Sequence, residues 1–305
     1  MDSEIVKNGD GEMSKDERKV YDRQIRLWGY DGQNKLRASK ILLIGMQGIG
    51  AEISKNLILS GVNSITLKDH TEVSILDRCS QFLIPRDSEE RNRAKASLSA
   101  AQKLNPNVKV IVDTTPIEEN VDSFVNSFDV VIATECSPST YKRLSENCRK
   151  ANVKLFIADV YGLFGYFYQD VIHAHPLYGE VFSNNAQIDT VTKKQPLLYY
   201  LTSALLKFQT DSHRKPNPDT SEEDIDELKS IIHHQIDYSS PDQEKTDDEF
   251  EEYYGELFCE LSPTTSIIGA LVAQNAINTI MNKPVEKYNV FFYNHIKHEG
   301  TFHLL

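Results

Sequence analysis

The stretch from Lys40 to Lys55 constrains the fold of this 305-residue chain more than any other. Ile41–Ile44 is a continuous aliphatic run, which is typical of a strand buried on both faces of a parallel sheet. Three glycines follow, Gly45, Gly48 and Gly50, and then the apolar spacing of a helix begins. Such a turn directs free backbone N–H groups and the positive end of the helix toward an anion. The stretch therefore predicts the β-α-β unit of a nucleotide-binding type of fold.

A ribose-binding acid is also predicted. The next strand is expected at 64–67, and Asp69 follows it, 19 residues after Gly50, where an acid can accept hydrogen bonds from a ribose hydroxyl. The glycine spacing departs from G-x-G-x-x-G, because Gln47 stands where a glycine lets the backbone approach a pyrophosphate. Two interpretations stay open: a nucleotide site formed by the three glycines and Asp69, or a well-packed turn that binds no nucleotide.

The alternation of strands and helices continues beyond this unit. We expect helices at 91–104 and 138–151 and strands at 108–112, 129–133 and 153–158. Short connections between alternating elements indicate an α/β, Rossmann-like fold, with a mainly parallel sheet and helices on both of its faces. Ligands of such sheets lie beyond the carboxyl ends of the strands, here near Gly45, Asp69 and Thr134.

The second half of the chain adds antiparallel strands and an insertion. Aromatic residues and glycines alternate over 161–175, which predicts antiparallel strands. His173 and His175 would share one face there, but a metal site needs three or four ligands, so no metal site is predicted. Residues 178–261 form a mixed helical insertion with expected helices at 196–208 and 221–236. An apolar helix at 263–281 and strands at 290–293 and 301–305 complete the prediction.

At the N-terminus, residues 1–13 are polar and expected to be disordered, so the folded domain spans 14–305 and is interrupted by the insertion. Ser14 and Glu17 have the spacing of a capping box, which predicts a helix that begins there and ends at Gly29. Arg23 and Arg26 lie on this helix; the simplest interpretation of both is a solvated surface charge.

Charge and composition exclude several classes of function. The net charge is −12, and the segment 221–256, with 14 acidic residues and two lysines, accounts for all of it. We interpret the acidic runs as solvated surface and expect no nucleic-acid partner, because no basic surplus exists. No run of 18 apolar residues is present, so no membrane contact is expected. The four scattered cysteines predict reduced thiols in a soluble intracellular protein: Cys79, Cys136, Cys148 and Cys259.

Several motifs identify a family. The segment Tyr21–Gly29, YDRQIRLWG, resembles the opening of the adenylating subunits that activate ubiquitin-like proteins. Similar segments of that family are matched by Gly45–Asp69, Leu104–Pro106, Ser262–Pro263, Ile268–Gly269 and Ala273–Gln274. The resemblance covers about 15–175 and 260 to the end. Within the family, Gln81–Ile84 and the small insertion are most similar to the smaller, non-catalytic subunits of heterodimers that activate SUMO.

The resemblance implies an enzyme that forms an acyl adenylate from ATP and the modifier's C-terminal glycine, then passes the acyl group to a cysteine. The family's ribose-binding acid matches Asp69, but its phosphate-binding arginine falls at Ser80 and its lysine at Arg93. The magnesium-binding aspartate falls at about Cys136. Serine cannot offset phosphate charge, arginine lacks the compact ammonium, and a thiol is a poor ligand for Mg²⁺.

We therefore expect the glycine turn and Asp69 to be a vestigial site that binds no cofactor firmly, with Mg-ATP used by a partner. The resemblance implies that this partner is a larger catalytic subunit carrying the active cysteine, because residues 177–256 contain no cysteine and Cys259 is expected to be a core residue. The resemblance implies that this chain contacts SUMO only indirectly. The resemblance also implies a nuclear, partly cytoplasmic location.

Arg23 is the one catalytic residue that the resemblance implies. In this family the first helix crosses the dimer interface, and the matching arginine reaches the ATP phosphates of the other half, as an arginine finger does. Alternatives remain open: the equivalent subunit for another ubiquitin-like protein, a self-sufficient adenylating homodimer of the bacterial cofactor-biosynthesis type, and an NAD-linked dehydrogenase. The residues at Gln47, Ser80 and Cys136 argue against the second, and no placed proton donor supports the third.

Overall fold

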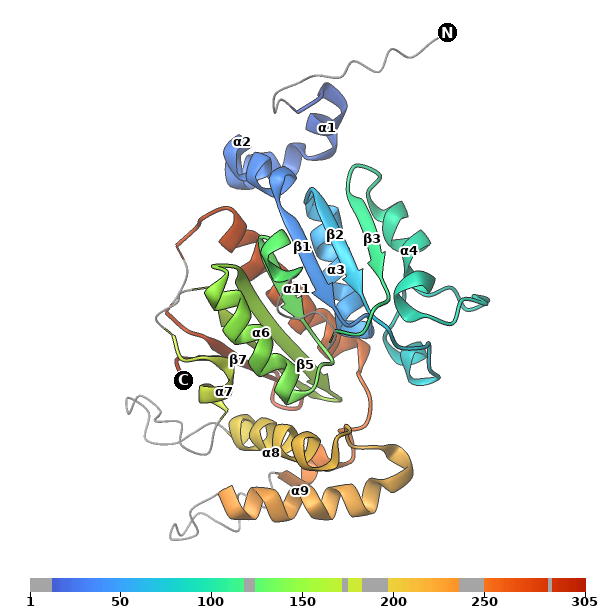
Figure 1. The fold of residues 1–305 in the computed structure, drawn as a ribbon, viewed down its shortest axis with the longest axis vertical. Coiled ribbons are helices and arrows are strands. Elements are labelled where there is room, and N and C mark those ends of the chain that lie inside the picture. Colours follow the sequence, from blue (N-terminus) through green and yellow to red (C-terminus); the bar gives the residue numbers. More distant parts are fainter. Residues whose placement is uncertain (1–12, 118–123, 172–174, 183–196, 236–249, 285–286) are drawn as a thin grey trace.

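The computed structural model describes residues 13–117, 124–171, 175–182, 197–235, 250–284 and 287–305 (Figure 1). Residues 1–12, for which disorder was predicted, lie outside the described residues. His173 lies outside them too. Met13, the first described residue, is buried. None of the described helices is long and apolar enough to cross a membrane.

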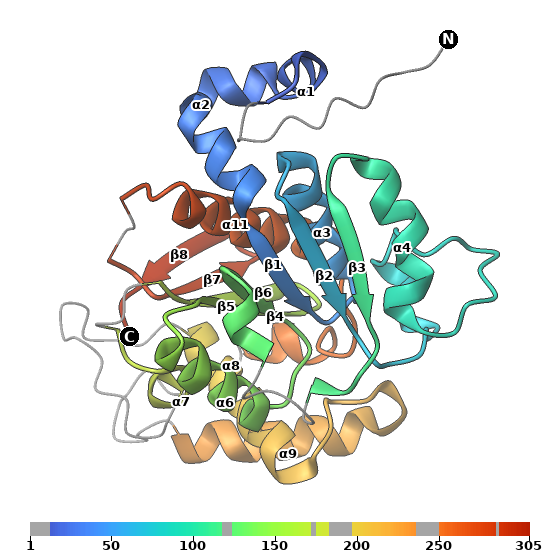
Figure 2. The same cartoon turned by 45° about the horizontal axis from the view of Figure 1, so that its top comes forward.

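One sheet of eight strands runs through the molecule in the order β3-β2-β1-β4-β5-β6-β7-β8 (Figure 2). The first five strands in this order are mutually parallel, and the last three add in antiparallel fashion. The Rossmann-like prediction is thus confirmed, with the order reversing between β1 and β4. The strands are β1 Lys40–Ile44, β2 Ser64–Lys68, β3 Lys109–Asp113, β4 Val130–Ala133, β5 Lys154–Tyr161, β6 Phe164–Asp170, β7 Val290–Asn294 and β8 Glu299–His303.

Helices cover both faces, because the side chains of each strand alternate between two cores. On β1, Ile41 and Leu43 join one hydrophobic core, whereas Leu42 and Ile44 join the other. The first core lies under α3 (Gly48–Ser60), α4 (Arg93–Leu104) and α11 (Ser262–Ile280). The second lies under α6 (Pro138–Lys150) and the helices of the insertion, α7 (Tyr178–Val181), α8 (Leu197–Ser212) and α9 (Ser221–Gln235).

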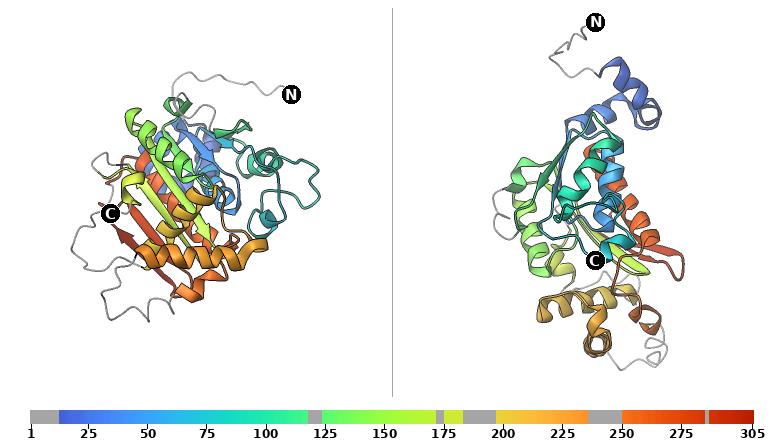
Figure 3. Two further views of the ribbon diagram at one scale, coloured as in Figure 1. Left: turned by 60° about the horizontal axis from the view of Figure 1, so that its bottom comes forward. Right: turned by 90° about the vertical axis from the view of Figure 1, so that its right-hand side faces the viewer.

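The insertion is packed onto the sheet rather than standing apart. Leu201, Leu205 and Phe208 of α8 belong to the same core as Phe164 and Tyr166 of β6. Figure 3 shows α8 and α9 against one end of the sheet, at the opposite end from the N-terminal helices. The insertion can therefore contribute side chains to a site formed by the strands.

The N-terminal helix differs from its prediction in one place. The capping box of Ser14 and Glu17 is present, but α1 (Lys15–Val20) stops at Tyr21 and α2 (Asp22–Ala38) follows it, so the prediction of one unbroken helix was wrong. Gly29 has the non-helical φ of +81° and interrupts α2, so the predicted helix end at Gly29 is confirmed. Tyr21 breaks the helix because its ring is buried and its hydroxyl accepts a 2.8 Å hydrogen bond from Asn105 Nδ2.

Candidate functional site

The glycine turn lies where β1 ends and α3 begins, at the carboxyl edge of the sheet. Gly45 has φ +86°, and a Cβ there would lie 2.5 Å from the carbonyl oxygen of Thr134. A Cβ at Gly50 would lie 2.2 Å from the carbonyl oxygen of Gly45. Both glycines are therefore required by the close packing of strand, turn and helix, with or without a ligand.

The third glycine, Gly48, has no room for a side chain. A Cβ at Gly48 would lie 2.0 Å from Ser80 Oγ and 2.8 Å from Glu260 Oε2. The backbone N–H of Ile49 donates a 3.0 Å hydrogen bond to the same oxygen of Glu260, and Ser80 Oγ lies 3.4 Å from it. One of the N–H groups that could bind an anionic ligand at the start of α3 is thus bound to a carboxylate of this chain.

Asp69, predicted as the ribose-binding acid, is also engaged within the chain. It is buried, and its Oδ2 accepts hydrogen bonds from the N–H of Met46 at 2.9 Å and from Arg93 Nη1 at 3.1 Å. Its Oδ1 accepts hydrogen bonds from the backbone and the hydroxyl of Thr71. Both carboxylate oxygens of Asp69 therefore already have protein partners.

Arg93 is the centre of a buried ion cluster. Its guanidinium lies 3.1 Å from Asp69, 3.0 Å from Asp77 and 2.6 Å from Glu135. Burial alone would lower the pKa of Arg93, but the three carboxylates outweigh that effect and raise the pKa above its ordinary value. The arginine at the family's lysine position therefore binds the protein's own acids inside the fold.

A second cation comes from the insertion. Lys215 Nζ lies 3.3 Å from Asp159 Oδ1, close to the ring of Tyr161. The same carboxylate accepts hydrogen bonds from the N–H of Glu135 and from the hydroxyl of Tyr141. Asp159 therefore links the end of β5, the turn after β4 and the insertion.

Acidic side chains gather around the glycine turn. Among the described residues there, the cations Arg93 and Lys215 lie near five acidic side chains: Asp69, Asp77, Glu135, Asp159 and Glu260. Burial raises the pKa of Glu260 to about 7, although Lys215 opposes the shift, and raises the pKa of Glu135 to about 8 against Arg93. Arg93 and Lys215 already contact carboxylates of this chain, so neither is available to offset the charge of a triphosphate.

The residues at this edge do not fit Mg-ATP. A cavity of about 350 Å³ remains beside the turn, lined in part by Gln47, Leu76, Tyr161, Lys215 and Glu260. Ser80, at the position of the phosphate-binding arginine, is buried against Gly48, and its neutral hydroxyl supplies no charge. Cys136, at the position of the magnesium-binding aspartate, is buried with its Sγ 3.4 Å from the Thr134 carbonyl oxygen.

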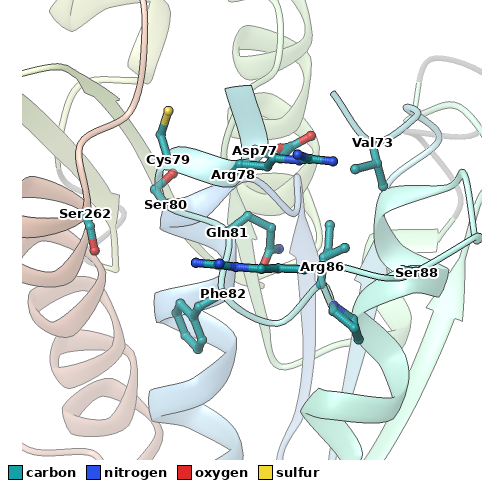
Figure 4. A pocket seen from close by; sticks show the side chains of 12 residues that line it. Val73, Asp77, Arg78, Cys79, Ser80, Gln81, Phe82, Arg86, Ser88 and Ser262 are labelled. Carbon is teal, nitrogen blue, oxygen red and sulfur yellow. The ribbon is translucent and has the colours of Figure 1, made fainter. Parts of the chain in front are cut away.

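The loop that carries Ser80 is fastened to the turn by Gln81, whose Nε2 donates to the carbonyl oxygen of Met46. This contact gives the Gln81–Ile84 motif a structural role. On the outer side of the loop lies a cavity of about 540 Å³, whose lining includes Arg78, Arg86 and the exposed ring of Phe82 (Figure 4).

Arg23 lies far from these residues. It is on α2, at the amino-terminal edge of the sheet, whereas the glycine turn lies beyond the carboxyl end of β1 (Figures 1 and 2). Arg23 is exposed, and in the described part of the chain its side chain has no ion pair or hydrogen bond. Val20, at the end of α1, is 63% exposed, and Leu27, one turn beyond Arg23 on α2, is 75% exposed. The arm formed by α1 and α2 therefore presents apolar and cationic side chains outside the body of the molecule.

Among the described residues, no group of three His, Cys, Asp or Glu residues could hold a metal ion. All four cysteines are free thiols; Cys79 is exposed, Cys136 and Cys148 are buried, and Cys259 is half-buried. Burial raises the pKa of Cys148 to about 12 and also raises that of Cys259. Such thiols are poor nucleophiles at neutral pH.

The structure thus brings together the three glycines and Asp69 and leaves Arg23 apart. Sequence reasoning missed Glu135, Asp159, Lys215 and Glu260. Glu135 and Asp159 carried a signal, since each lies at the carboxyl end of a predicted strand, where ligands collect. Lys215 and Glu260 belong to the predicted insertion, and no local pattern distinguished either from a surface charge.

The eight-stranded, mostly parallel sheet and the glycine turn between β1 and α3 define a class of protein, the adenylating-enzyme fold. In agreement, the model of the ThiF family matches residues 21–304. A known structure, the crystal structure of selenomethionine PaaA, superposes with a TM-score of 0.62 over 99% of this chain and 78% of that one. At 15% identity, this likeness concerns the fold alone.

Curated relatives identify a narrower group of proteins within this class. SUMO-activating enzyme subunit 1 of Homo sapiens is 35% identical over 95% of this chain and 95% of its own length. The protein of the same name from Danio rerio is 34% identical, covering 98% of this chain and 97% of its own length. The chain therefore belongs to the ThiF family and, within it, to the SUMO-activating enzyme subunit 1 proteins.

Proposed function

We propose that this chain is the smaller, non-catalytic subunit of a heterodimer that activates SUMO. Its larger partner would adenylate the C-terminal glycine of SUMO with Mg-ATP and then take the acyl group onto its own cysteine as a thioester. This chain would form no adenylate and hold no cofactor firmly. It would act in the nucleus and partly in the cytoplasm, with no nucleic-acid or membrane partner.

One observation carries the proposal: the N–H of Ile49 and the carboxylate of Asp69 already have internal partners. In a nucleotide-binding turn these groups face the phosphates and the ribose. Here Glu260 and Arg93 bind to them instead. An adenylating reaction in this family would then depend on a second subunit whose own site is intact.

Arg23 supports the dimeric part of the proposal. Its guanidinium has no partner among the described residues and lies on a helix that stands away from the sheet. We infer that Arg23 reaches the ATP phosphates bound by the partner and stabilises the charge that develops there. The neighbouring apolar residues Val20 and Leu27 would supply the contact area for docking.

ATP–pyrophosphate exchange tests the proposal. The assay compares this chain alone, a candidate larger subunit alone, and both together, with SUMO and with a panel of other ubiquitin-like proteins. We expect exchange to require the pair and to respond to SUMO. Turnover by this chain alone would overturn the proposal in favour of a self-sufficient homodimer. A response to a different modifier would assign the chain to another activating pair. In a separate assay, reduction of NAD by the chain with an alcohol or hydroxy acid as hydride donor would support the dehydrogenase alternative.

A further inference from the structure

The carboxyl end of α3 holds the N-terminal arm in place. The carbonyl groups in the last turn of a helix need partners from outside the helix. Three of them accept hydrogen bonds of 2.9–3.0 Å from side-chain amides: Ile58 from Asn105, Leu59 from Gln24 and Ser60 from Gln33. Gln24 and Gln33 both belong to α2, on opposite sides of Gly29. The end of α3 therefore binds α2 at two points, one on each side of its kink.

Gly29 divides α2 into two parts (Figure 2). Its φ of +81° and ψ of 170° are not helical, and a Cβ there would meet nothing within 4 Å. Packing at Gly29 therefore does not set the angle between the two parts. The first part, residues 22–28, is the Arg23 segment, and contacts elsewhere must determine its direction.

Gln33 makes one of these contacts across the kink. Its side chain is fully buried and uses both ends of its amide. Nε2 donates a 2.9 Å hydrogen bond to the carbonyl oxygen of Ser60, and Oε1 accepts a 3.0 Å hydrogen bond from Trp28 Nε1. Trp28 is the last residue of the Arg23 segment, so Gln33 links this segment to the end of α3. Losing either bond would leave a polar group without a partner, which favours the observed angle.

Tyr21 fixes the other end of the Arg23 segment. Its ring is buried, and its hydroxyl accepts a 2.8 Å hydrogen bond from Asn105 Nδ2, the same amide that binds the end of α3. The ring also lies against Gly61, where a Cβ would be 2.6 Å from Tyr21 Cζ. Between the two ends, Gln24 binds the segment to α3 directly. The Arg23 segment is thus held along its whole length.

We propose that Gln33 is a positioning residue, which holds the Arg23 segment at a fixed angle and so presents Arg23 to the ATP phosphates bound by the partner. The inference rests on the proposed function, in which Arg23 acts in the partner's site. Arg23 itself has no ion pair or hydrogen bond among the described residues, so its backbone alone directs the guanidinium. Gln33 is buried and acts only through Arg23. A displacement of about 1 Å in such a group lowers a rate by up to about 100-fold.

Fluorescence of Trp28 tests the position of the Arg23 segment, because Trp28 is the only tryptophan of the chain. Gln33→Met in the full-length chain keeps a long side chain and removes both hydrogen bonds. We expect acrylamide to quench Trp28 more strongly and the fluorescence anisotropy to fall, because the segment is released. Asp31→Asn, at an exposed residue in the same part of α2, is the control and should give wild-type signals. Unchanged Trp28 signals in folded Gln33→Met would overturn the inference.

Single-turnover adenylation by the reconstituted heterodimer tests the effect on the reaction. We expect Gln33→Met to slow adenylate formation about tenfold, with little change in the ATP concentration that gives half the maximal rate. Combined with Arg23→Ala, Gln33→Met should slow the reaction no further, since a positioning residue acts only through the residue that it positions. Equal slowing with and without Arg23 would overturn the inference, as would wild-type adenylation by Gln33→Met when Arg23→Ala is slow.

Gln24→Met is the second variant, used if Gln33→Met does not fold. The hydrogen bond from Gln24 to Leu59 is exposed, so the fold should tolerate its loss, and smaller changes in the same direction are expected. Failure of the inference and failure of the proposed function give different results. Wild-type adenylation by Arg23→Ala would overturn the role of Arg23 in the partner's site. Trp28 that stays protected in the folded glutamine variants would overturn the positioning role alone.

Discussion

Arg93 Nη1 lies 3.1 Å from Asp69 Oδ2, inside the protein. The family resemblance assigns a lysine to the first position and a ribose-binding acid to the second, and in this chain the residues at these two positions contact each other. An arginine can do this because its planar fork contacts several carboxylates at once, and here it also contacts Asp77 and Glu135. Arg93 and these three acids form a buried ion cluster, which leads to the first prediction.

Replacing Arg93 by methionine should destabilise the chain by about 3–5 kcal/mol, because three acids lose their common cation within the fold. Urea unfolding of the full-length chain measures this directly. Arg91→Met, at an exposed arginine two residues earlier, is the control, and we expect it to change the free energy of unfolding by less than about 0.5 kcal/mol. Equal effects of the two substitutions would show that the cluster contributes nothing specific.

Arg23→Ala should slow adenylate formation by the reconstituted heterodimer by a factor of about 10–100. A charge-assisted contact to phosphate contributes on the order of 1.5–3 kcal/mol, which corresponds to that factor. Assembly and the melting temperature should hardly change, because Arg23 is exposed and has no partner within the described part of the chain. Single-turnover adenylation measures the effect.

Arg26→Ala is the control for Arg23. Arg26 is also exposed but pairs with Asp22 at 2.8 Å on its own helix, so its loss should be much milder. If Arg23→Ala adenylates at the wild-type rate in a fully assembled heterodimer, Arg23 is only a surface charge.

No cysteine of this chain should carry the modifier. A chain with Cys136 and Cys148 replaced by alanine, and Cys79 and Cys259 by serine, should still support thioester formation on the partner at the wild-type level. The reason is that Cys136 and Cys148 are buried and the pKa of Cys259 is raised by burial. Gel analysis with and without reductant reads the outcome, after folding is checked by circular dichroism. A reductant-sensitive adduct on the unmodified chain would contradict the prediction.

The stability of the chain should fall as pH rises from about 6 to 8.5. Glu260 and Glu135 have native pKa values of about 7 and about 8, above the value of about 4.3 in an unfolded chain. The native state therefore binds more protons in this window, and its stability decreases with increasing pH through both native pKa values.

Glu135→Gln and Glu260→Gln mimic the protonated forms, so each should flatten the pH dependence of the melting temperature between pH 6 and 8.5. Thermal unfolding at a series of pH values measures this. Glu256→Gln, at an exposed acid, should leave the curve as it is. A wild-type melting temperature that stays constant over the window would refute the proposed titration.

The elements of the fold follow from local patterns. The aliphatic run at Ile41–Ile44, the glycines after it and the capping box at Ser14 each act within a few residues, so the sequence alone predicts them. In the structure, these three stretches form the buried strand β1, the turn that joins β1 to α3, and the start of α1. The opening motif Tyr21–Gly29 likewise indicated the family before any contact was known.

Contacts between distant segments required the tertiary structure. The helix break at Tyr21 depends on Asn105, 84 residues away, and the bond from Ile49 to Glu260 spans 211 residues. From the sequence and the family resemblance we predicted a nucleotide site that has Gln47 in place of a glycine and Ser80 in place of an arginine. The sequence could not predict which groups inside the protein would bind Ile49 and Asp69, because the partner of a buried charge or of a free N–H group depends on how helices and strand ends pack in three dimensions.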